Sequence, residues 1–432
     1  MISVDQALDN VLSNINVLEE QDYSILECLG LVLAEDVYSK LDVPPRDNSA
    51  LDGYAVRSAD IKGASLQNPR ILRVIDIVVA GGVPEKHVES GTAIRIMTGA
   101  PTPPGADCVI GFEDTDETQR VIMENGTPNE IGITVEEQPF ANIRKAGESV
   151  HKGDLVLAKG TIIRPSEIGV LASMGYSTIK AIRRPVIAIL ATGDELRDLG
   201  ENLTEGKIYN SNTYSIAAQV LRDGAIPKIL GIALDNEASV VSKIEKGLDA
   251  DLLITIGGVS MGDYDVVKDV LAKQGEIVFW KVRAKPGKPL AFGKINRTAV
   301  GEKSNYIPQL GLAGNAVSCM VNYELFVRPA ILKMMGKKNL VKPTVEAIIE
   351  DDIKNNDNRR IFARVVVEKR NGHYYARLTG PQGSGILRSM ALANGLAIVC
   401  EDVPQVRKGD KLNVMMLDWV QDIYPGIQRI DN

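Results

Sequence analysis

Three carboxylates in the second half of the chain each follow a β-prone apolar run. Glu195 comes after PVIAILATGD, Asp235 after KILGIAL, and Asp265 after DLLITI and a short loop. Because parallel strands end at one edge of a sheet, we expect these three side chains to lie together. Acids gathered in this way repel one another unless a cation or a positively charged ligand lies between them, and oxygen ligands favour magnesium. The sequence therefore predicts a metal-binding and catalytic trio, with helix capping by each acid as the alternative.

The loop that leads to Asp265 is rich in glycine. Gly257 and Gly258 follow the apolar run 252–256, and Ser260 adds a hydroxyl. Glycine allows a ligand to approach main-chain N–H groups directly, and a helix is expected to begin just after the loop. This pattern predicts a binding site for an anion beside a divalent cation. An ordinary turn in which Asp265 only caps the helix is the other interpretation.

A basic segment, residues 279–293, supplies the opposite charge. Its cationic side chains are Lys281, Arg283, Lys285 and Lys288. Proline and glycine residues among them restrict the backbone, which favours an anion clamp over a run of solvated lysines. Lys281, Lys285 and Lys288 are therefore predicted to bind substrate.

Hydroxyl groups recur beside glycine turns near the C-terminal half of the chain. Ser318 stands at the start of a predicted long helix, a position that suits a phosphate. Ser384 lies in the loop GPQGSGI, and Arg359, Arg360 and Arg364 lie just upstream of it. A β module that only stabilises a dimer is the alternative for this last region.

Two polar residues in the first half are further candidates. Asp52 lies in the segment 42–56, which contains two prolines and is predicted to be a long irregular loop. Thr98 stands at a predicted strand end and offers a hydroxyl to a ligand. Turn formation, in which such an Asp bonds its own backbone, is the alternative for Asp52.

The elements around these residues predict a multidomain α/β plus β protein. Strand and helix patterns alternate from residue 184 and indicate a doubly wound, mostly parallel sheet. Short β-prone runs, RVIMEN among them, predict an inserted β-rich domain, and the strands after residue 337 predict a barrel-like β domain. The expected divisions are 1–45 with 146–180 as a linking helical and β region, 46–145 as the inserted domain, 181–336 as the α/β domain, and 337–432 as the C-terminal domain.

Two helices are predicted outside the α/β part. Residues 3–16 carry an apolar stripe, with Ser3 and Gln6 as a capping box. A second helix is expected to begin at Pro165 or Ser166.

Composition limits the classes of partner. The net charge of −7 argues against nucleic acid, because an acidic surface repels phosphate backbones. No apolar run reaches membrane-spanning length, and the N-terminus lacks the pattern of a signal peptide, so a cytoplasmic protein is expected. The four cysteines form no CxxC pair and are expected to be reduced.

A set of motifs taken together carries a family resemblance. In chain order they are DNSALDGYAV, RIMTGA, TGDEL, GGVSMGDYD, KPGKPLAFG, GNAVS and GPQGSG. This set resembles the molybdopterin molybdenumtransferase family, which includes the MoeA proteins and the E domain of gephyrin. The resemblance implies a homodimer of four-part subunits, with an α/β part similar to molybdopterin adenylyltransferase. Molybdopterin adenylyltransferase is also an expected partner.

The resemblance also implies a reaction and roles for residues. Adenylylated molybdopterin and molybdate, with a divalent cation such as Mg²⁺, would give molybdenum cofactor and AMP. Asp52 and Thr98 match motif residues of the family, and Glu195, Asp235 and Asp265 match its acids around metal and nucleotide. The positions that match the family's molybdate site are Lys285, Lys288, Ser318, Arg359 and Ser384, with Lys281 as another functional lysine.

Some positions depart from the family pattern, and other functions stay open. Ala313 and Ala316 replace the prolines of LPGNPVS, and Ser149 stands where Asp is common. Loss of proline increases the freedom of a loop, here the loop that presents Ser318. The alternatives are a paralogue that uses tungstate, and a non-catalytic scaffold like the E domain of gephyrin.

Overall fold

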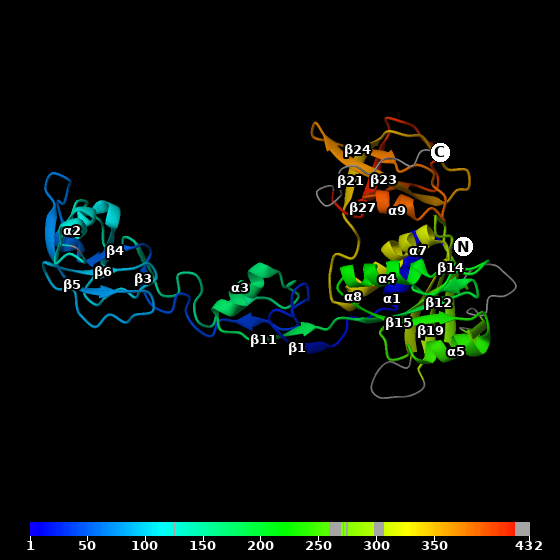
Figure 1. Cartoon of the computed structure of the whole chain (residues 1–432), viewed down its shortest axis with the longest axis horizontal. Coiled ribbons are helices and arrows are strands. Elements are labelled where there is room, and N and C mark those ends of the chain that lie inside the picture. Colours follow the sequence, from blue (N-terminus) through cyan, green and yellow to red (C-terminus); the bar gives the residue numbers. More distant parts are fainter. Residues whose placement is uncertain (125, 259–268, 271, 274, 298–305, 420–432) are drawn as a thin grey trace. The chain divides into compact units, whose positions relative to one another are not determined.

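The computed structural model describes residues 1–124, 126–258, 269–270, 272–273, 275–297 and 306–419 (Figure 1). The chain forms two compact units, each described separately below. The first unit comprises Met1–Asp22, Gly30–Ala34 and Lys180–Asn432, and the second comprises Tyr23–Leu29 and Glu35–Ile179. Ser260 and Asp265, both predicted site residues, lie outside the described residues.

A six-stranded sheet forms the centre of the first unit. Its order is β15-β12-β16-β20-β19-β17. The strands are β15 (Ile226–Ala233), β12 (Val186–Thr192), β16 (Leu252–Ile256), β20 (Tyr306–Leu312), β19 (Pro289–Asn296) and β17 (Gly275–Lys281). The first four are parallel, and the last two are antiparallel additions. The predicted doubly wound, mostly parallel sheet is confirmed.

Burial explains why the strands of this sheet read as continuous apolar runs. All five residues of β16 are buried, as a central parallel strand covered on both faces requires. Helix α4 (Ser211–Arg222) contacts β12 and β15 and buries Ile216 and Val220, and α5 (Glu237–Glu245) packs on β15. The carboxyl ends of β12, β15, β16 and β20 therefore share one edge of the sheet, where the sequence predicts the site.

A long helical segment follows β20. It consists of α7 (Ala316–Asn322), the π-helical turn η3 (Tyr323–Val327) and α8 (Arg328–Met334). Asn315 precedes the first turn, as the sequence predicts, and Val317, Ser318 and Cys319 are buried.

The C-terminal part of the first unit is a closed β-barrel. Its strands pair in the order β23-β24-β21-β27-β25, and β25 returns to β23. They are β21 (Thr344–Ile349), β23 (Arg360–Arg370), β24 (His373–Leu378), β25 (Gly395–Val399) and β27 (Lys411–Met416). The predicted barrel-like domain is confirmed. A short strand of the basic segment, β18 (Ala284–Lys285), adds to the start of β23 in parallel.

The second unit contains a five-stranded sheet, in the order β7-β4-β6-β5-β8. Its strands are β7 (Cys108–Gly111), β4 (Gly53–Val56), β6 (Thr92–Ile96), β5 (Arg70–Val78) and β8 (Glu130–Ile133). The segment 42–56 is thus not entirely irregular, because β3 (Asn48–Ser49) and β4 lie within it. Both faces of β4 are buried: Tyr54 and Val56 pack into one core cluster, and Ala55 into another.

The run RVIMEN is not a strand. Most of it lies in helix α2 (Glu117–Glu124), whose Ile122 and Met123 are 77% and 82% exposed. Glu117 in the first turn favours the helix N-terminus, and Arg120 Nε donates to Asp116 Oδ2 at 2.7 Å. Local helix stabilisation outweighs the β propensity of side chains that have no core to enter.

The two predicted outer helices are present. Helix α1 (Val4–Ser13) begins after Ser3, whose hydroxyl accepts from Gln6 N at 3.1 Å while Gln6 Oε1 accepts from Ser3 N at 3.0 Å. Helix α3 (Pro165–Ser173) begins at the predicted proline. None of the four cysteines is joined in a disulfide bond. Among the described residues, no helix has the length and apolar character needed to cross a membrane.

Candidate active site

The tips of β12 and β15 are joined through two aspartates. Asp194 N donates to Asp235 Oδ2 at 3.4 Å, and Asp235 N donates to Asp194 Oδ1 at 3.1 Å. The strands pair directly up to Thr192 and Ala233, so these carboxylates are fixed at neighbouring strand ends. The predicted Asp235 is therefore partnered by Asp194, a residue of the TGDEL turn that the sequence argument left outside the site.

Glu195 lies exposed at the same edge. Its carboxylate folds back over the α-carbon of Gly193, where a Cβ would collide with it. Its carbonyl accepts from Ile208 N at 2.9 Å, and Lys207 Nζ donates to the carbonyl of Asp194 at 2.9 Å. These hydrogen bonds to backbone carbonyls hold the turn that carries the Glu195 side chain.

The described part of the chain does not complete a metal site. No group of three or more His, Cys, Asp or Glu side chains gathers at metal-binding distance among these residues. Glu195 and Asp235 lie at adjacent strand tips, and Asp265 is outside the described residues. The carboxylates present are the hard oxygen donors that magnesium requires, and the predicted trio stays a prediction.

The glycine turns after β16 and β20 lie side by side. Gly257 has φ +91°, its N–H donates to the carbonyl of Leu312 at 3.1 Å, and an added Cβ would meet the Thr192 carbonyl at 2.7 Å. At Gly314, which follows β20, the nearest atom to an added Cβ would be the Gly257 α-carbon, 3.9 Å away. Gly258 has φ +62°. At position 257 only glycine fits beside the Thr192 carbonyl, and the approach of a ligand to this turn stays a prediction.

The basic loop, defined here as residues 281–288, is held against α7. Asn322 is fully buried, and its Nδ2 donates to the carbonyls of Gly287 at 3.3 Å and Pro289 at 3.0 Å. Gly287 has φ +103°, and a Cβ there would collide with the Asn322 amide. The Lys285–Pro286 peptide bond is cis. The backbone of this loop is therefore fixed, as the proline and glycine pattern predicts.

Lys281 and Lys288 lie at opposite ends of the basic loop. Lys281 ends β17 and pairs in register with Pro289, while the carbonyl of Lys288 accepts from Val282 N at 3.1 Å. Lys288 is exposed, and Lys281 is half-buried. The hairpin-like closure thus brings both predicted lysines to the base of one loop.

Lys285 and Arg359 meet through a carboxylate that the sequence argument missed. Pairing of β18 with β23 aligns Lys285 with Ile361, two residues after Arg359. Arg359 Nε donates to Asp357 Oδ2 at 3.0 Å, and Lys285 Nζ lies 3.6 Å from the same oxygen. The hydrogen bond from Arg359, with the charge of Lys285, holds the pKa of Asp357 below its usual range. Asp357 therefore occupies the space between two cations predicted to bind an oxyanion.

The two predicted serines belong to segments in direct contact. The barrel loop, residues 380–386, carries Ser384, whose carbonyl accepts from Val317 N at 3.1 Å. Ser318 follows in the first turn of α7 and is 3% exposed. The helix start therefore touches the barrel loop, and Asn322 on the same helix touches the basic loop. The barrel loop thus meets the start of α7, and the basic loop meets Asn322, the last residue of the same helix.

Asp52 and Thr98 meet in the second unit. Thr98 donates to Asp52 Oδ1 through its backbone N–H at 2.7 Å and its hydroxyl at 2.8 Å. Both residues are exposed. These hydrogen bonds hold the pKa of Asp52 below its ordinary value, so the carboxylate is ionised at neutral pH. The predicted pair is brought together, with the Thr98 hydroxyl committed to Asp52.

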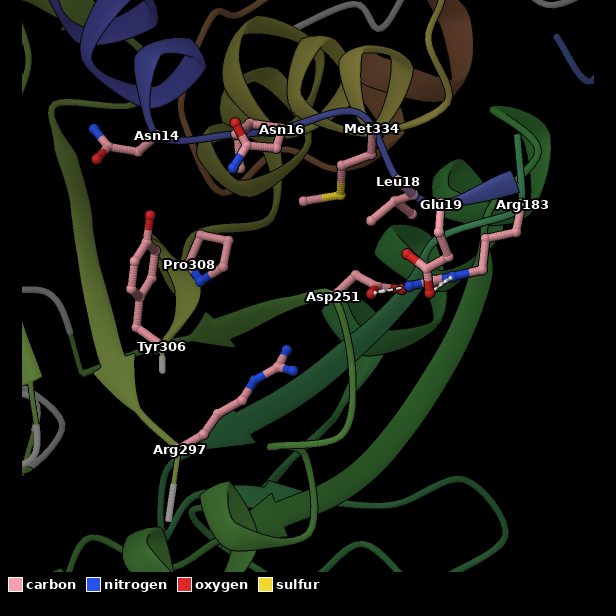
Figure 2. A pocket seen from close by; sticks show the side chains of 11 residues that line it. Asn14, Asn16, Leu18, Glu19, Arg183, Asp251, Arg297, Tyr306, Pro308 and Met334 are labelled. Carbon is pink, nitrogen blue, oxygen red and sulfur yellow. Dashed lines mark hydrogen bonds and ion pairs between the residues drawn. The ribbon is translucent and has the colours of Figure 1, made fainter. Parts of the chain in front are cut away.

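A cavity of about 550 Å³ lies at the other end of the central sheet (Figure 2). Arg183 and Asp251 form two hydrogen bonds of 2.6 Å on its wall, and Arg297 extends toward it in the view. Arg183 precedes β12, Asp251 precedes β16, and Tyr306 begins β20, so the cavity is at the amino ends of the strands. It contains none of the predicted site residues.

Family comparisons cover most of the chain. Residues 2–175 match the MoeA N-terminal region (domain I and II), residues 188–333 match a probable molybdopterin binding domain, and residues 346–417 match the MoeA C-terminal region (domain IV). The acidic strand tips and the basic loop fall in the second of these regions, and the barrel loop falls in the third.

Curated relatives and solved structures agree with these matches. Molybdopterin molybdenumtransferase 2 of Mycobacterium tuberculosis is 36% identical over 397 residues, 90% of this chain and 93% of the relative. Molybdopterin molybdenumtransferase of Haemophilus influenzae is 35% identical and covers 96% of this chain and 98% of its own. A crystal structure of the molybdopterin biosynthesis MoeA protein from Pyrococcus horikoshii superposes with a TM-score of 0.79 at 30% identity, covering 97% of this chain and 100% of that chain. By its motifs, its fold and its relatives, this chain belongs to the MoeA family.

Proposed function

We propose that this chain is a molybdopterin molybdenumtransferase, which combines adenylylated molybdopterin with molybdate, releases AMP and yields molybdenum cofactor. Relatives of that name align with nearly the whole chain. The observation that carries the proposal is the convergence of the basic loop and the barrel loop on α7, through Asn322 and Val317. Cations and hydroxyls on these segments are the groups that bind a tetrahedral oxyanion.

Molybdate is assigned to this convergence. Lys285 and Arg359 supply charge, and Lys288 and Lys281 add positive potential at the base of the basic loop. Ser318 and Ser384 supply hydroxyl donors from the helix start and the barrel loop. Fixing the oxyanion beside its acceptor replaces a bimolecular encounter with a positioned one, which lowers the entropic part of the barrier.

The adenylyl phosphate is assigned to the carboxyl edge of the sheet. Gly257, Gly258 and Ser260 would let the phosphate approach the main chain. Glu195, Asp235 and Asp265 would hold magnesium, which supplies charge neutralisation for the phosphate and the leaving AMP. Asp194 keeps Asp235 at its strand tip by the reciprocal hydrogen bonds.

The remaining assignments concern the second unit and the assembly. Asp52 is proposed as a catalytic residue, together with Thr98, which holds it by two hydrogen bonds. A homodimer, a cytoplasmic location, the four-part division of the chain, and receipt of substrate from molybdopterin adenylyltransferase complete the proposal. These follow from the resemblance of the motifs and from the family to which the chain belongs.

The direct test of this function is turnover with defined substrates. The purified chain is incubated with adenylylated molybdopterin and Mg²⁺, with and without molybdate, and AMP and active molybdenum cofactor are measured. We expect both products only when molybdate is present. Lys285→Met should abolish that dependence, while Lys411→Met, which removes an exposed lysine paired with Glu346 at 2.7 Å on the barrel, should not. Wild-type protein that forms neither product refutes the proposal.

A further inference from the structure

One buried arginine lies directly beneath the barrel loop. Arg364 of β23 is 1% exposed, and desolvation lowers its pKa to about 10. Within the described part of the chain, no carboxylate forms a salt bridge with it, although buried charges are usually paired. Burial of this charge is costly, so the contacts of the guanidinium must explain why an arginine stands at this position.

The guanidinium is satisfied by the barrel loop itself. Its Nη2 donates to the carbonyls of Gly383 at 2.9 Å and Pro381 at 3.4 Å, and its Nη1 donates to the carbonyl of Gln382 at 3.2 Å. Its Nε donates to Ser389 Oγ at 3.0 Å, which fixes the plane of the fork. Arginine therefore binds three successive carbonyls at once, a geometry that lysine does not provide.

The backbone of Arg364 also forms hydrogen bonds with the barrel loop and the residue before it. Arg364 N donates to Gln382 Oε1 at 2.8 Å, and its carbonyl accepts from Thr379 N at 3.1 Å. Gln382 Nε2 also donates to the Gly380 carbonyl at 3.0 Å. Thr379, which precedes the barrel loop, and Gln382 within it are thus both tied to one position of β23.

The direction of the carbonyls matters for an anion. The carbonyls of residues 381–383 are turned toward Arg364, and the next one, of Ser384, is taken by Val317 N at 3.1 Å. Carbonyl oxygens carry partial negative charge and would repel an oxyanion placed beside the loop. By drawing them inward, the guanidinium leaves the hydroxyl of Ser384 and a net positive charge for the outer side.

We propose that Arg364 is a positioning residue for the oxyanion site: it draws the barrel-loop carbonyls inward, fixes Ser384 against α7 and leaves its own charge unneutralised. The inference rests on the proposed function, because it assumes that Ser384 binds molybdate. Arg364 itself does not touch the substrate. Its effect on the reaction is exerted through the loop and the electrostatic potential.

The test separates oxyanion positioning from general stabilisation of the barrel. Arg364→Lys keeps the charge but loses the fork, so we expect the KM for molybdate to rise about tenfold or more, the order expected for lost hydrogen bonds to a charged group. The KM for adenylylated molybdopterin should change less than about twofold. Arg377→Lys is the matched control, because Arg377 lies on the neighbouring strand β24 with Glu368 3.7 Å away on the barrel surface.

A second variant covers the case in which Arg364→Lys does not fold. Ser389→Ala removes the hydroxyl that orients Nε and leaves the arginine in place, so the KM for molybdate should rise by a smaller factor in a folded protein. Equal KM values in wild type and both folded variants, or a fall in kcat alone that tracks the loss of folded protein, would overturn the proposal.

The proposed function is tested alongside by Ser384→Ala and Lys285→Met. If these two variants raise the KM for molybdate and the Arg364 and Ser389 variants do not, only the role of Arg364 is refuted. If none of the four changes that KM while turnover persists, the assignment of molybdate to the basic loop and the barrel loop is wrong, and the inference falls with it.

Discussion

The amide of Val317 donates a 3.1 Å hydrogen bond to the carbonyl of Ser384, and this contact joins the start of α7 to the barrel loop. It places Ser318, next along the helix, beside a loop that comes from a different part of the chain. Through this contact the barrel loop that carries Ser384 is attached to the α/β part of the first unit. The predictions below depend on such contacts between segments distant in sequence.

Asp357→Asn should strengthen molybdate binding. The carboxylate lies between Arg359 and Lys285 and competes with an oxyanion for the same cations. A partly exposed ion pair contributes up to about 1 kcal/mol, so the KM for molybdate should fall by a factor of up to about five. Glu346→Gln, which removes an exposed carboxylate paired with Lys411, is the control. A raised KM would instead mean that Asp357 orients Arg359 for binding.

Asp194→Asn should slow AMP release without changing molybdate binding. The Asp194 carboxylate accepts from Asp235 N at 3.1 Å and adds negative charge at the strand tips. If this edge holds the cation, a lost carboxylate should lower the rate of AMP release about tenfold or more, or about 1.4 kcal/mol, and raise the concentration of Mg²⁺ required. The control is Glu237→Gln, which alters an exposed carboxylate of α5 paired with Lys273. Rates equal to wild type at every Mg²⁺ concentration would exclude Asp194 from the site.

Gly257→Ala should destabilise the first unit more than Gly200→Ala. Both glycines have positive φ, +91° and +88°, so each substitution costs about 1–2 kcal/mol from the backbone conformation. Only at position 257 would the Cβ meet backbone, the Thr192 carbonyl at 2.7 Å, which adds about 1–3 kcal/mol of overpacking. Urea unfolding of both variants measures the difference. Equal losses would show that the turn can shift without cost.

Glu167→Gln should reveal a pH-dependent contribution to the stability of the second unit. Hydrogen bonds from Arg164, from Nη2 at 2.6 Å and from the backbone N–H at 2.9 Å, lower the pKa of Glu167 to about 2 from 4.5. A carboxyl group with a lowered folded-state pKa stabilises the fold above pH 4.5, and this contribution disappears as the pH falls toward 2. The difference in unfolding free energy between wild type and Glu167→Gln should therefore shrink over that range. Glu85→Gln, at an exposed position, serves as the control, and a constant difference would contradict the assignment.

Regular patterns made the architecture predictable from the sequence. Buried parallel strands such as β16 are apolar throughout, and alternation with amphipathic helices fixes the sheet type, so the acids that follow the strands could be placed at one edge. The glycines of the turns could likewise be predicted, because Gly257 stands where a Cβ would strike the neighbouring strand end. The errors were local. The segment 42–56 was predicted to be irregular because of its two prolines, although it contains the strand β4. The run RVIMEN was predicted to be a strand, although most of it lies in α2.

The missed residues act through contacts that no spacing reveals. Asp357 has a role only because β18 pairs with β23 and brings Lys285 to it. Arg364 was noted upstream of the barrel loop, and its contact with the carbonyls of that loop, about twenty residues later, could not be predicted from the sequence. Asp194 was visible in TGDEL directly before Glu195, and its contact with Asp235 depends on the pairing of β12 with β15. Side-chain partners of this kind depend on strand register and loop closure, which hydrophobic periodicity does not encode.

Anomalous diffraction from crystals soaked with tungstate, a heavy analogue of molybdate in charge and shape, tests the central claim most directly. The account predicts a peak within hydrogen-bonding reach of Lys285 Nζ, the Arg359 guanidinium and the Ser384 hydroxyl, with the Asp357 carboxylate displaced from between the two cations. A tungstate peak bound only elsewhere on the chain, with Asp357 still bridging Lys285 and Arg359, would contradict it.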